Sequence, residues 1–462
     1  MGKTGKTTTV FVCRECGKES LRWLGYCPGC QQWNTYVETT KINTPGGRAS
    51  SGVLSPPEEL SQISPDRKER CVVPLAEFNR VLGGGVVAGS LVLIAGEPGI
   101  GKSTLLLRVA DLVARQSGRV VYVSGEETAR QIKLRAERLG VSGDGIFLIP
   151  ETALDVIIGQ LEELRPALAV IDSIQTVYQS ELDTAPGSIA QVRECTVRLM
   201  RWAKQSGVQV IITGHVTKDG SIAGPRVLEH IVDAVLYLEG EPFSAYRLLR
   251  CNKNRFGSTN EVGIFEMKSA GLIEVADPSQ VLLARREAAA VGSVVVPALE
   301  GSRTLLVEIQ ALTNPTSFGL PRRTANGVDF GRLLMITAVL SRRCGLKLGN
   351  QDIIVNVTGG LRIGEPAADL GIALAIASSY RDAEVIPGLV AVGEVGLSGE
   401  LRAVSQLERR VGEAARLGFE CCLVPEVGGT IKSRGIKLVT AASLKAAITQ
   451  GLRRQRATAQ EA

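Results

Sequence analysis

The chain has 462 residues, of which 22% are charged and 44% hydrophobic, and its basic side chains exceed its acidic ones by 53 − 47 = 6. These values describe an ordinary soluble protein with room for roughly two to four domains. No apolar stretch of about 18 residues could span a bilayer, and the N-terminus lacks the apolar run of a signal peptide. We therefore expect a cytoplasmic protein without a membrane partner, whose mild positive charge permits contact with nucleic acid.

Four cysteines lie close together near the N-terminus, in the pattern Cys13-x2-Cys16, ten residues, Cys27-x2-Cys30. Each pair can place two thiolates on one metal ion, and two pairs complete the tetrahedral sulfur set that suits Zn²⁺. The metal would replace the hydrophobic core that so short a segment cannot build. We therefore predict a C4 zinc finger in residues 1–45. We interpret the other cysteines as small buried hydrophobic residues; they are Cys71, Cys195, Cys251, Cys344, Cys421 and Cys422.

The rest of the chain divides by composition into further blocks. Residues 46–70 are rich in glycine, serine, proline and charge, which is typical of a linker. Over residues 71–276, short β-rich runs alternate with helical patterns, which predicts βαβ units and a parallel sheet. Residues 277–290 are predicted to be a second linker, and residues 291–462 mix strands with apolar helices.

The middle block contains a phosphate loop. A β-run at residues 91–95 leads into GEPGIGKST, and an amphipathic helix follows, which is the context that the pattern G-x4-G-K-[ST] requires. The backbone amides and the helix N-terminus would face the phosphates, the lysine would neutralise them, and the serine hydroxyl would coordinate Mg²⁺. The residues expected to hold ATP are Gly96, Glu97, Pro98, Gly99, Ile100, Gly101, Lys102, Ser103 and Thr104. A similar segment, GKTGKTTT at residues 2–9, has no strand before it, and we interpret it as a flexible basic tail.

Polar side chains end three further strand-like runs. Asp172 ends an apolar strand and is predicted to hold Mg²⁺ through water. Glu126 and Glu127 end another strand, on the ligand side of such sheets, where a carboxylate could activate the attacking water. We favour Glu126; the alternatives are Glu127, or that both acids only cap the following helix. His215 stands where a sensor of the γ-phosphate would lie, and the alternative is a loop histidine without a function.

A second charged group occurs in CNKNRFGSTNEVG, between two strand-like runs. One interpretation is a solvated hairpin turn, and the other is a charged finger that reaches a phosphate on another molecule. Its candidate residues are Lys253, Asn254, Arg255, Phe256 and Gly257.

The order of these motifs resembles the RecA-type ATPase core of recombinases and hexameric helicases. With the four cysteines in front and KNRFG behind, the whole chain is similar to the RadA (Sms) family of bacterial DNA repair proteins. The resemblance implies an α/β fold, in which a RecA-like P-loop ATPase core lies between an N-terminal zinc ribbon and a C-terminal Lon-protease-like α+β domain. It also implies a head-to-tail hexameric ring, in which Lys253 and Arg255 reach either a neighbour's nucleotide or DNA. Phe256 and Gly257 would fix the turn or stack on a base.

The same resemblance implies the function. We expect a DNA-dependent ATPase of recombinational repair that uses ATP, Mg²⁺ and Zn²⁺ and is associated with the nucleoid. It would act on single-stranded and branched DNA, with the recombinase RecA, to promote branch migration. The alternatives are an ATP-dependent protease and a non-enzymatic adaptor in which nucleotide only switches the conformation.

The last block resembles the proteolytic domain of Lon, whose chemistry needs a hydroxyl nucleophile and a lysine base. The serine position falls in Pro366-Ala367-Ala368-Asp369, which has no hydroxyl, and the lysine position falls on Glu408, beside Arg409. We therefore expect a proteolytically inactive domain that serves oligomerisation or faces DNA. The basic side chains that could face DNA, or could be ordinary solvated charges, are Arg322, Arg323, Arg342, Arg343 and Lys347.

Overall fold

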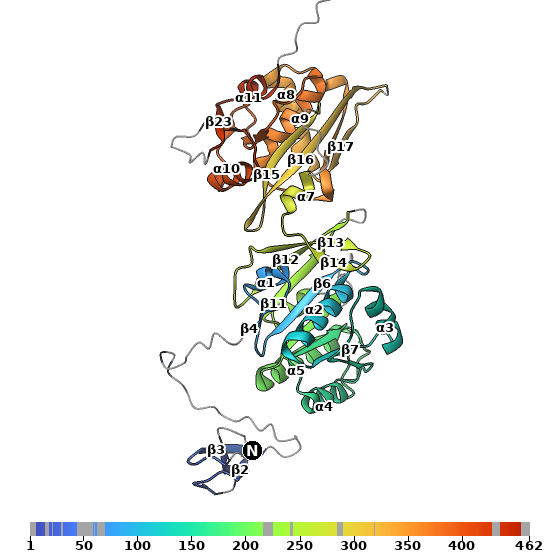
Figure 1. The fold of residues 1–462 in the computed structure, drawn as a ribbon, viewed down its shortest axis with the longest axis vertical. Coiled ribbons are helices and arrows are strands. Elements are labelled where there is room, and N and C mark those ends of the chain that lie inside the picture. Colours follow the sequence, from blue (N-terminus) through green and yellow to red (C-terminus); the bar gives the residue numbers. More distant parts are fainter. Residues whose placement is uncertain are drawn as a thin grey trace, which may run out of the picture. The chain divides into compact units, whose positions relative to one another are not determined.

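The computed structural model divides into two compact units, Met1–Lys68 and Glu69–Ala462 (Figure 1). In the described part of the chain, no helix has the length and apolar character needed to cross a membrane. The residues that the structure describes are 6–13, 18–20, 22–28, 31–43, 59, 61, 70–215, 225–240, 244–283, 290–317, 319–426 and 435–453.

The small unit contains a three-stranded antiparallel sheet, in which β1 (Lys6–Cys13) lies between β2 (Glu19–Ser20) and β3 (Tyr36–Asn43). Residues 6–9 pair with the end of β3. The prediction of a flexible basic tail is therefore wrong for these residues. The run Thr-Thr-Thr-Val-Phe-Val is rich in β-branched side chains, which favour a strand over a tail.

The first sheet of the large unit has nine strands in the order β14-β13-β12-β11-β6-β10-β9-β7-β8. Strands β6 to β11 are mutually parallel, and β12 to β14 add an antiparallel extension. The continuous apolar runs of β6, β7 and β9 fit strands that are covered on both faces. The strands are β6 (Leu91–Gly96), β7 (Val120–Ser124), β8 (Ile146–Ile149), β9 (Leu168–Asp172), β10 (Gln209–His215), β11 (Ala234–Glu239), β12 (Tyr246–Asn254), β13 (Val262–Lys268) and β14 (Gly271–Glu274); a separate ribbon pairs β4 (Arg70–Cys71) with β5 (Val86–Val87).

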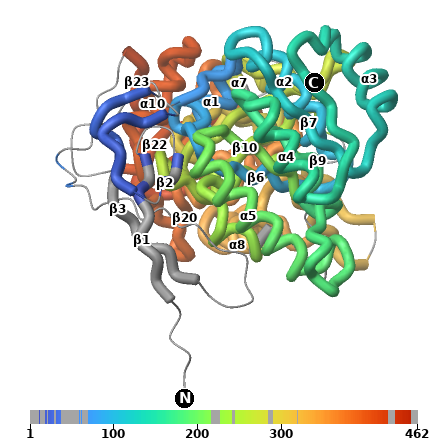
Figure 2. Tube along the Cα trace, turned by 90° about the horizontal axis from the view of Figure 1, so that it is seen from below, coloured from blue at the N-terminus to red at the C-terminus, as the bar shows by residue number. Residues whose placement is uncertain are grey.

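Helices cover both faces of this sheet, as a doubly wound α/β fold requires. One core packs against α1 (Ala76–Leu82), α2 (Lys102–Ser117) and α3 (Ala129–Arg138). The other core packs against α4 (Leu154–Leu164) and α5 (Ile189–Ser206). Helices α2 and α5 lie on opposite sides of β6 and β10 (Figure 2). The short helix α6 (Pro225–Leu228) precedes β11.

The second sheet of the large unit has seven strands in the order β17-β18-β16-β15-β19-β22-β23. Helix α9 is buried along almost its whole length, because it is apolar on every side. The strands are β15 (Ser293–Glu300), β16 (Arg303–Pro315), β17 (Arg323–Asn326), β18 (Gln351–Val357), β19 (Leu389–Ala391), β22 (Cys421–Pro425) and β23 (Lys437–Ala441), with a hairpin of β20 (Glu394–Val395) and β21 (Leu401–Arg402). The helices are α7 (Pro278–Leu283), α8 (Phe330–Cys344), α9 (Asp369–Arg381), α10 (Leu407–Arg416) and α11 (Leu444–Gly451), and the 3-10 turns are η2 (Leu348–Asn350), η3 (Thr358–Gly360) and η4 (Pro366–Ala368).

Ion pairs join the two sheets of the large unit. Glu77 of α1 is buried, and its carboxylate accepts hydrogen bonds from Arg303 of β16 and from the Ile264 amide of β13. Arg250 of β12 pairs with Glu300 of β15 at 2.7 Å and with Glu239 at 2.9 Å. Helix α7 lies within the segment predicted as a linker. The two sheets therefore belong to one compact unit with charged contacts across their boundary.

The cysteines outside the N-terminal cluster behave largely as predicted. Cys195, Cys251, Cys421 and Cys422 are buried, whereas Cys71 and Cys344 are half-buried. None of the eight cysteines in the described residues forms a disulfide.

Candidate nucleotide site and its surroundings

The phosphate loop leaves β6 at Gly96 and ends at Gly101, the N-cap of α2. A Cβ atom on Gly96 would lie 2.5 Å from the Leu238 carbonyl oxygen, so the close passage of β11 requires glycine there. Gly101 has φ 114, a conformation that favours glycine, and it offers no side chain to cap α2. The first amides of α2 therefore remain available to an anion.

Lys102 lies over this loop. Its Nζ atom donates to the carbonyl oxygens of Gly96 at 2.9 Å and Glu97 at 3.0 Å, and it lies 3.2 Å from His215 Nδ1. Burial lowers the pKa of Lys102, and the charges of Asp172 and Glu126 oppose that shift. The ammonium group is thus held where the loop would present a phosphate.

His215 also connects the loop with Glu126. Its Nε2 atom lies 3.5 Å from Glu126 Oε1, which accepts a hydrogen bond of 2.8 Å from Ser173 Oγ. Strand β7 ends at Ser124, so Glu126 stands in the turn after the strand rather than in it. Lys102, His215 and Glu126 therefore form one chain of contacts at the edge where the parallel strands end, which we call the carboxyl edge.

Glu127 has a different environment. It pairs with Arg135 of α3, while its amide donates to Ser124 Oγ at 3.1 Å. Helix α3 is capped by Thr128, which forms a capping box with Gln131. Thr128 therefore caps α3, Glu127 interacts with that helix through Arg135, and the geometry favours Glu126 over Glu127 as the residue near the loop.

Asp172 is oriented by two neighbours that the sequence analysis missed. Its Oδ1 accepts from Thr213 Oγ1 at 2.7 Å, and its Oδ2 accepts from the Tyr122 hydroxyl at 2.6 Å. Burial and then the charge of Asp172 raise the pKa of Tyr122 well above its usual value, so the phenol remains a donor. A carboxylate oxygen has two lone pairs, so both oxygens can still accept from a water on Mg²⁺. The signal in the sequence was one polar residue inside each of the two apolar strands that flank β9, Tyr122 in β7 and Thr213 in β10.

The KNRFG segment lies at the opposite edge of the same sheet, where the parallel strands begin, which we call the amino edge. Ala234 of β11 pairs with both Asn254 and Val92. Val92 and Gly96 are separated by four residues of β6, or about 13 Å at about 3.3 Å per residue. Lys253 and Arg255 therefore lie away from the phosphate loop of their own chain.

The segment lies between two antiparallel strands, as predicted, but only part of it forms the turn. Strand β12 continues to Asn254, so Lys253 and Asn254 are strand residues and the turn begins at Arg255. Lys253 Nζ donates to the carbonyl oxygens of Glu229 and Val232. Asn254 Oδ1 accepts from the Phe256 amide at 2.9 Å, and a Cβ on Gly83 would lie 3.4 Å from Gly257 Cα. Lys253 and Asn254 are therefore held against the fold, whereas residues 255–257 form an exposed turn.

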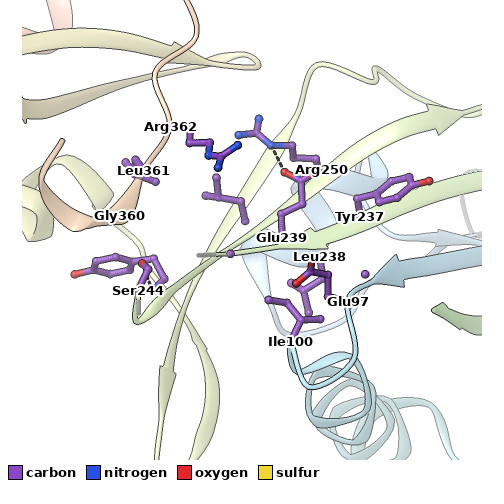
Figure 3. Close-up of a pocket in the computed structure, with 14 residues that line it drawn as sticks. Glu97, Ile100, Tyr237, Leu238, Glu239, Ser244, Arg250, Gly360, Leu361 and Arg362 are labelled. Carbon is purple, nitrogen blue, oxygen red and sulfur yellow. Dashed lines mark hydrogen bonds and ion pairs between the residues drawn. The ribbon is translucent and has the colours of Figure 1, made fainter. Parts of the chain in front are cut away.

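A cavity of about 650 Å³ adjoins the start of the phosphate loop (Figure 3). Its walls come from the loop, from β11 and β12, and from the segment after β18. The size lies within the usual range of small-molecule sites. The sequence could not reveal it, because its far wall comes from the second sheet. Residues on its walls include Glu97, Ile100, Tyr237, Arg250, Leu361 and Arg362.

The small unit fits a zinc ion. Cys13 and Cys27 are buried in one small cluster with Tyr36. The amide of each cysteine donates to a carbonyl five residues later, from Cys13 to Lys18 and from Cys27 to Gln32. Two matching turns thus bring two thiols into a core too small to stabilise the unit alone. The other two predicted ligands, Cys16 and Cys30, lie outside the described residues.

The segment that matches the Lon serine position is held by ion pairs on both sides. Before it, Glu365 binds Arg410 of α10 through two hydrogen bonds of 2.6 and 2.7 Å. At its end, buried Asp369 binds Arg332 and accepts from the Val395 amide at 3.2 Å. Helix α10 directs Arg410 inward, and Glu408, to which the lysine position was assigned, is exposed. An arginine cannot serve as a general base at ordinary pH.

The basic residues of the second sheet differ in their roles. The Arg323 guanidinium donates to the carbonyl oxygens of Gln351 and Leu348, so it stabilises the turn around η2. Arg343 Nε donates to the Leu397 carbonyl at 3.3 Å. Arg322, Arg342 and Lys347 have exposed side chains.

Three family models match parts of the chain. An AAA domain model matches residues 56–221, a rubredoxin metal binding domain model matches residues 11–38, and a model of the ChlI subunit of Mg-chelatase matches residues 319–427. A KaiC-like protein from Pyrococcus horikoshii has 21% identity and a TM-score of 0.38, covering 45% of this chain and 98% of its own. The predicted fold class is confirmed: a P-loop ATPase domain lies between a zinc ribbon and a C-terminal α+β domain.

Curated relatives match nearly the whole chain. A protein named DNA repair protein RadA from Halalkalibacterium halodurans is 52% identical and covers 94% of this chain and 97% of its own. Proteins of the same name from Bacillus subtilis and Listeria monocytogenes are 50% and 51% identical, covering 97% and 91% of this chain and 99% and 93% of their own lengths.

Proposed function

This chain belongs to the family of proteins named DNA repair protein RadA, and from that premise we propose that it couples ATP hydrolysis to movement on single-stranded DNA during recombinational repair. The observation that carries the proposal is the convergence of Lys102, His215 and Glu126 at the carboxyl edge, beside the open amides of α2. A nucleotide-binding site that only senses ATP does not need a carboxylate beside the terminal phosphate.

The proposed reaction assigns a role to each of these side chains. Ser103 and Asp172 would hold Mg²⁺, which neutralises phosphate charge when bound. Glu126 accepts a proton from the attacking water, whose oxygen forms a bond to the γ-phosphorus as the bond to the bridging oxygen of ADP breaks. Lys102 stabilises the phosphate charge. His215 would turn from Lys102 towards the γ-phosphate, which makes it a sensor.

We further propose that the active form is a head-to-tail hexameric ring. The position of Lys253 and Arg255 at the amino edge supports this arrangement, because they are remote from their own loop. In a head-to-tail contact, that edge of one copy can approach the carboxyl edge of the next. An arginine supplied in this way stabilises charge on the transferring phosphoryl group.

The partners in this proposal are single-stranded and branched DNA and the recombinase RecA, with branch migration as the outcome, in the nucleoid. The exposed side chains of Arg322, Arg342 and Lys347 are candidate contacts for DNA phosphates on the C-terminal domain. The C-terminal domain would act as a scaffold and not as a protease. Zn²⁺ would be held by Cys13, Cys16, Cys27 and Cys30.

The test is steady-state ATP hydrolysis by the full chain with and without single-stranded DNA, combined with mass photometry under the same conditions. We expect hydrolysis that single-stranded DNA stimulates, together with an oligomer in the presence of nucleotide. A protein that binds ATP but does not hydrolyse it with any DNA would instead be a nucleotide-dependent adaptor. ATP-dependent degradation of casein would establish the protease alternative and contradict the scaffold role.

A further inference from the structure

Asp233 is a buried carboxylate that the proposed hydrolysis does not use. It lies just before β11 at the amino edge, and its side chain is 1% exposed. Its Oδ2 atom accepts from the Leu91 amide at 3.1 Å, at the start of the strand that leads to the phosphate loop. A carboxylate so deeply buried needs compensating charges and hydrogen bonds.

Two cations from distant parts of the chain meet at this carboxylate. Lys204, in the last turn of α5, places Nζ 3.1 and 3.2 Å from the two carboxylate oxygens. Arg255 places Nη1 3.1 Å from Oδ1, and its amide donates to the Asp233 carbonyl. The cationic side chains are 47% and 48% exposed, so they are bound on one side and open to solvent on the other.

The cluster carries more positive charge than one carboxylate can neutralise. Lys204 and Arg255 contact Asp233, and Lys253 interacts electrostatically with both Asp233 and Glu229. Three cations and two carboxylates leave a local charge of about +1. Burial and then the charge of Arg255 lower the pKa of Lys253, with Asp233 opposing the shift. Within the described residues, the Arg255 guanidinium contacts Asp233 through Nη1 alone. Its Nη2 and Nε atoms can therefore donate to a further anion.

We propose that Asp233 is a positioning residue that holds Arg255 and Lys204 towards a phosphoryl group of a nucleotide bound by a second copy of this chain, with Lys204 as a second cation of that contact. The inference rests on the proposed function. A single carboxylate concentrates the cations around one point, which matches one multiply charged phosphoryl group better than the spaced single charges of a DNA strand. The amino-edge position then requires that the phosphoryl group belong to another protomer.

The first experiment compares Asp233→Asn with Asp111→Asn in the full chain. Asparagine keeps an oxygen for the Leu91 amide but removes the charge that orients the two cations. Asp111 is an equally buried carboxylate on α2, paired with Arg115, and serves as the matched control. We expect Asp233→Asn to lower kcat for DNA-stimulated hydrolysis about 10-fold or more, with KM for ATP within about twofold of wild type.

Lys204→Gln should lower kcat in the same direction, because it removes the second cation. If Asp233→Asn and Lys204→Gln both hydrolyse ATP at the wild-type rate, the inference is wrong. If Asp233→Asn loses ATP affinity and thermal stability together with kcat, its role is structural and the inference is again wrong.

The second experiment mixes Asp233→Asn with Lys102→Ala before oligomers form. With random mixing, about a quarter of the seams join an intact phosphate loop to an intact amino edge. We therefore expect the mixture of two impaired variants to hydrolyse more ATP than the sum of the separate proteins. The absence of any such gain would show that Asp233 does not act on a neighbour's nucleotide.

DNA affinity measured at several salt concentrations tests the alternative that the cations bind a DNA phosphate. A fall of about one in the salt slope for Lys204→Gln would assign the contact to DNA and overturn the inference. Arg255→Ala is measured in parallel. If Arg255→Ala hydrolyses ATP at the wild-type rate, the proposed contact with the neighbour's nucleotide is wrong. If Arg255→Ala loses hydrolysis while Asp233→Asn remains fully active, only the role of Asp233 is wrong.

Discussion

At the carboxyl edge of the nine-stranded sheet, Lys102 lies among His215, Glu126 and Asp172, so one cation is surrounded by acids and open amides. At the amino edge the cations outnumber the acids, since Lys204 and Arg255 share the single carboxylate of Asp233. One edge can bind a phosphate and activate water, and the other can supply positive charge. The carboxyl edge has a single cation, Lys102, and the proposed contact between copies would add the cations of the amino edge to it.

The difference between the edges also follows from the fold. In parallel strands the carboxyl ends meet at one edge, together with the N-termini of the helices that follow them. The amino edge receives the C-terminal ends of helices such as α5, where lysine and arginine are favourable. The same topology thus separates the anion site from the cationic cluster by the length of a strand.

The largest expected effect comes from removing the cation of the carboxyl edge. Lys102→Ala deletes the ammonium group over the loop, so we expect hydrolysis to fall to about 1% of wild type or less. Phosphate release measures the effect, with the exposed Lys133→Ala on α3 as the control. Retention of DNA-stimulated hydrolysis would contradict the assignment of the loop.

The amino edge should affect turnover without affecting nucleotide affinity. Arg255→Ala is expected to lower kcat by about 100-fold or more, because an arginine supplied in trans acts on the transition state. ADP affinity should stay within about twofold. Arg108→Ala, another half-exposed arginine in the same domain, is the control. An equal loss of ADP affinity would place Arg255 in the nucleotide site of its own chain.

A smaller effect is expected from the hydroxyl that orients Asp172. Tyr122→Phe removes one hydrogen bond of about 1 kcal/mol, or about a fivefold change in an equilibrium. We expect the Mg²⁺ concentration for half-maximal hydrolysis to rise by about that factor. Tyr178→Phe is the control, because Tyr178 is a half-buried tyrosine after β9 whose amide donates to the Thr152 carbonyl. An unchanged Mg²⁺ requirement would mean that Thr213 alone orients the carboxylate.

The smallest expected effect is a shift in the pH dependence of nucleotide binding. Burial lowers the pKa of Lys102 from 10.5, so the lysine loses its charge at a lower pH than an exposed lysine does. ADP affinity should therefore fall as pH rises through that lowered pKa and be restored below it. Calorimetric titration of ADP between neutral and alkaline pH measures this, and constant affinity up to pH 10.5 would contradict it.

Much of the carboxyl edge could be predicted, because each of its main residues follows a recognisable strand. The loop, Asp172 and His215 stand at strand ends as expected, and Glu126 stands two residues beyond its strand. Tyr122 and Thr213 were missed because they lie inside apolar strands, where a polar residue has no motif. Sequence alone also left Glu126 and Glu127 as alternatives, and the choice between them required the contacts of Arg135 and His215.

The sequence by itself determined the order of zinc ribbon, phosphate-loop domain and C-terminal domain, and the identity of the loop residues, because periodicity and motif spacing are local properties of the chain. Only the tertiary structure decided that Lys204, Asp233 and Arg255 meet, since α5, the start of β11 and the end of β12 are brought together by strand pairing. It also decided that this cluster lies away from its own phosphate loop. Burial, and the distance between two edges of one sheet, arise from packing between segments that are far apart in the chain.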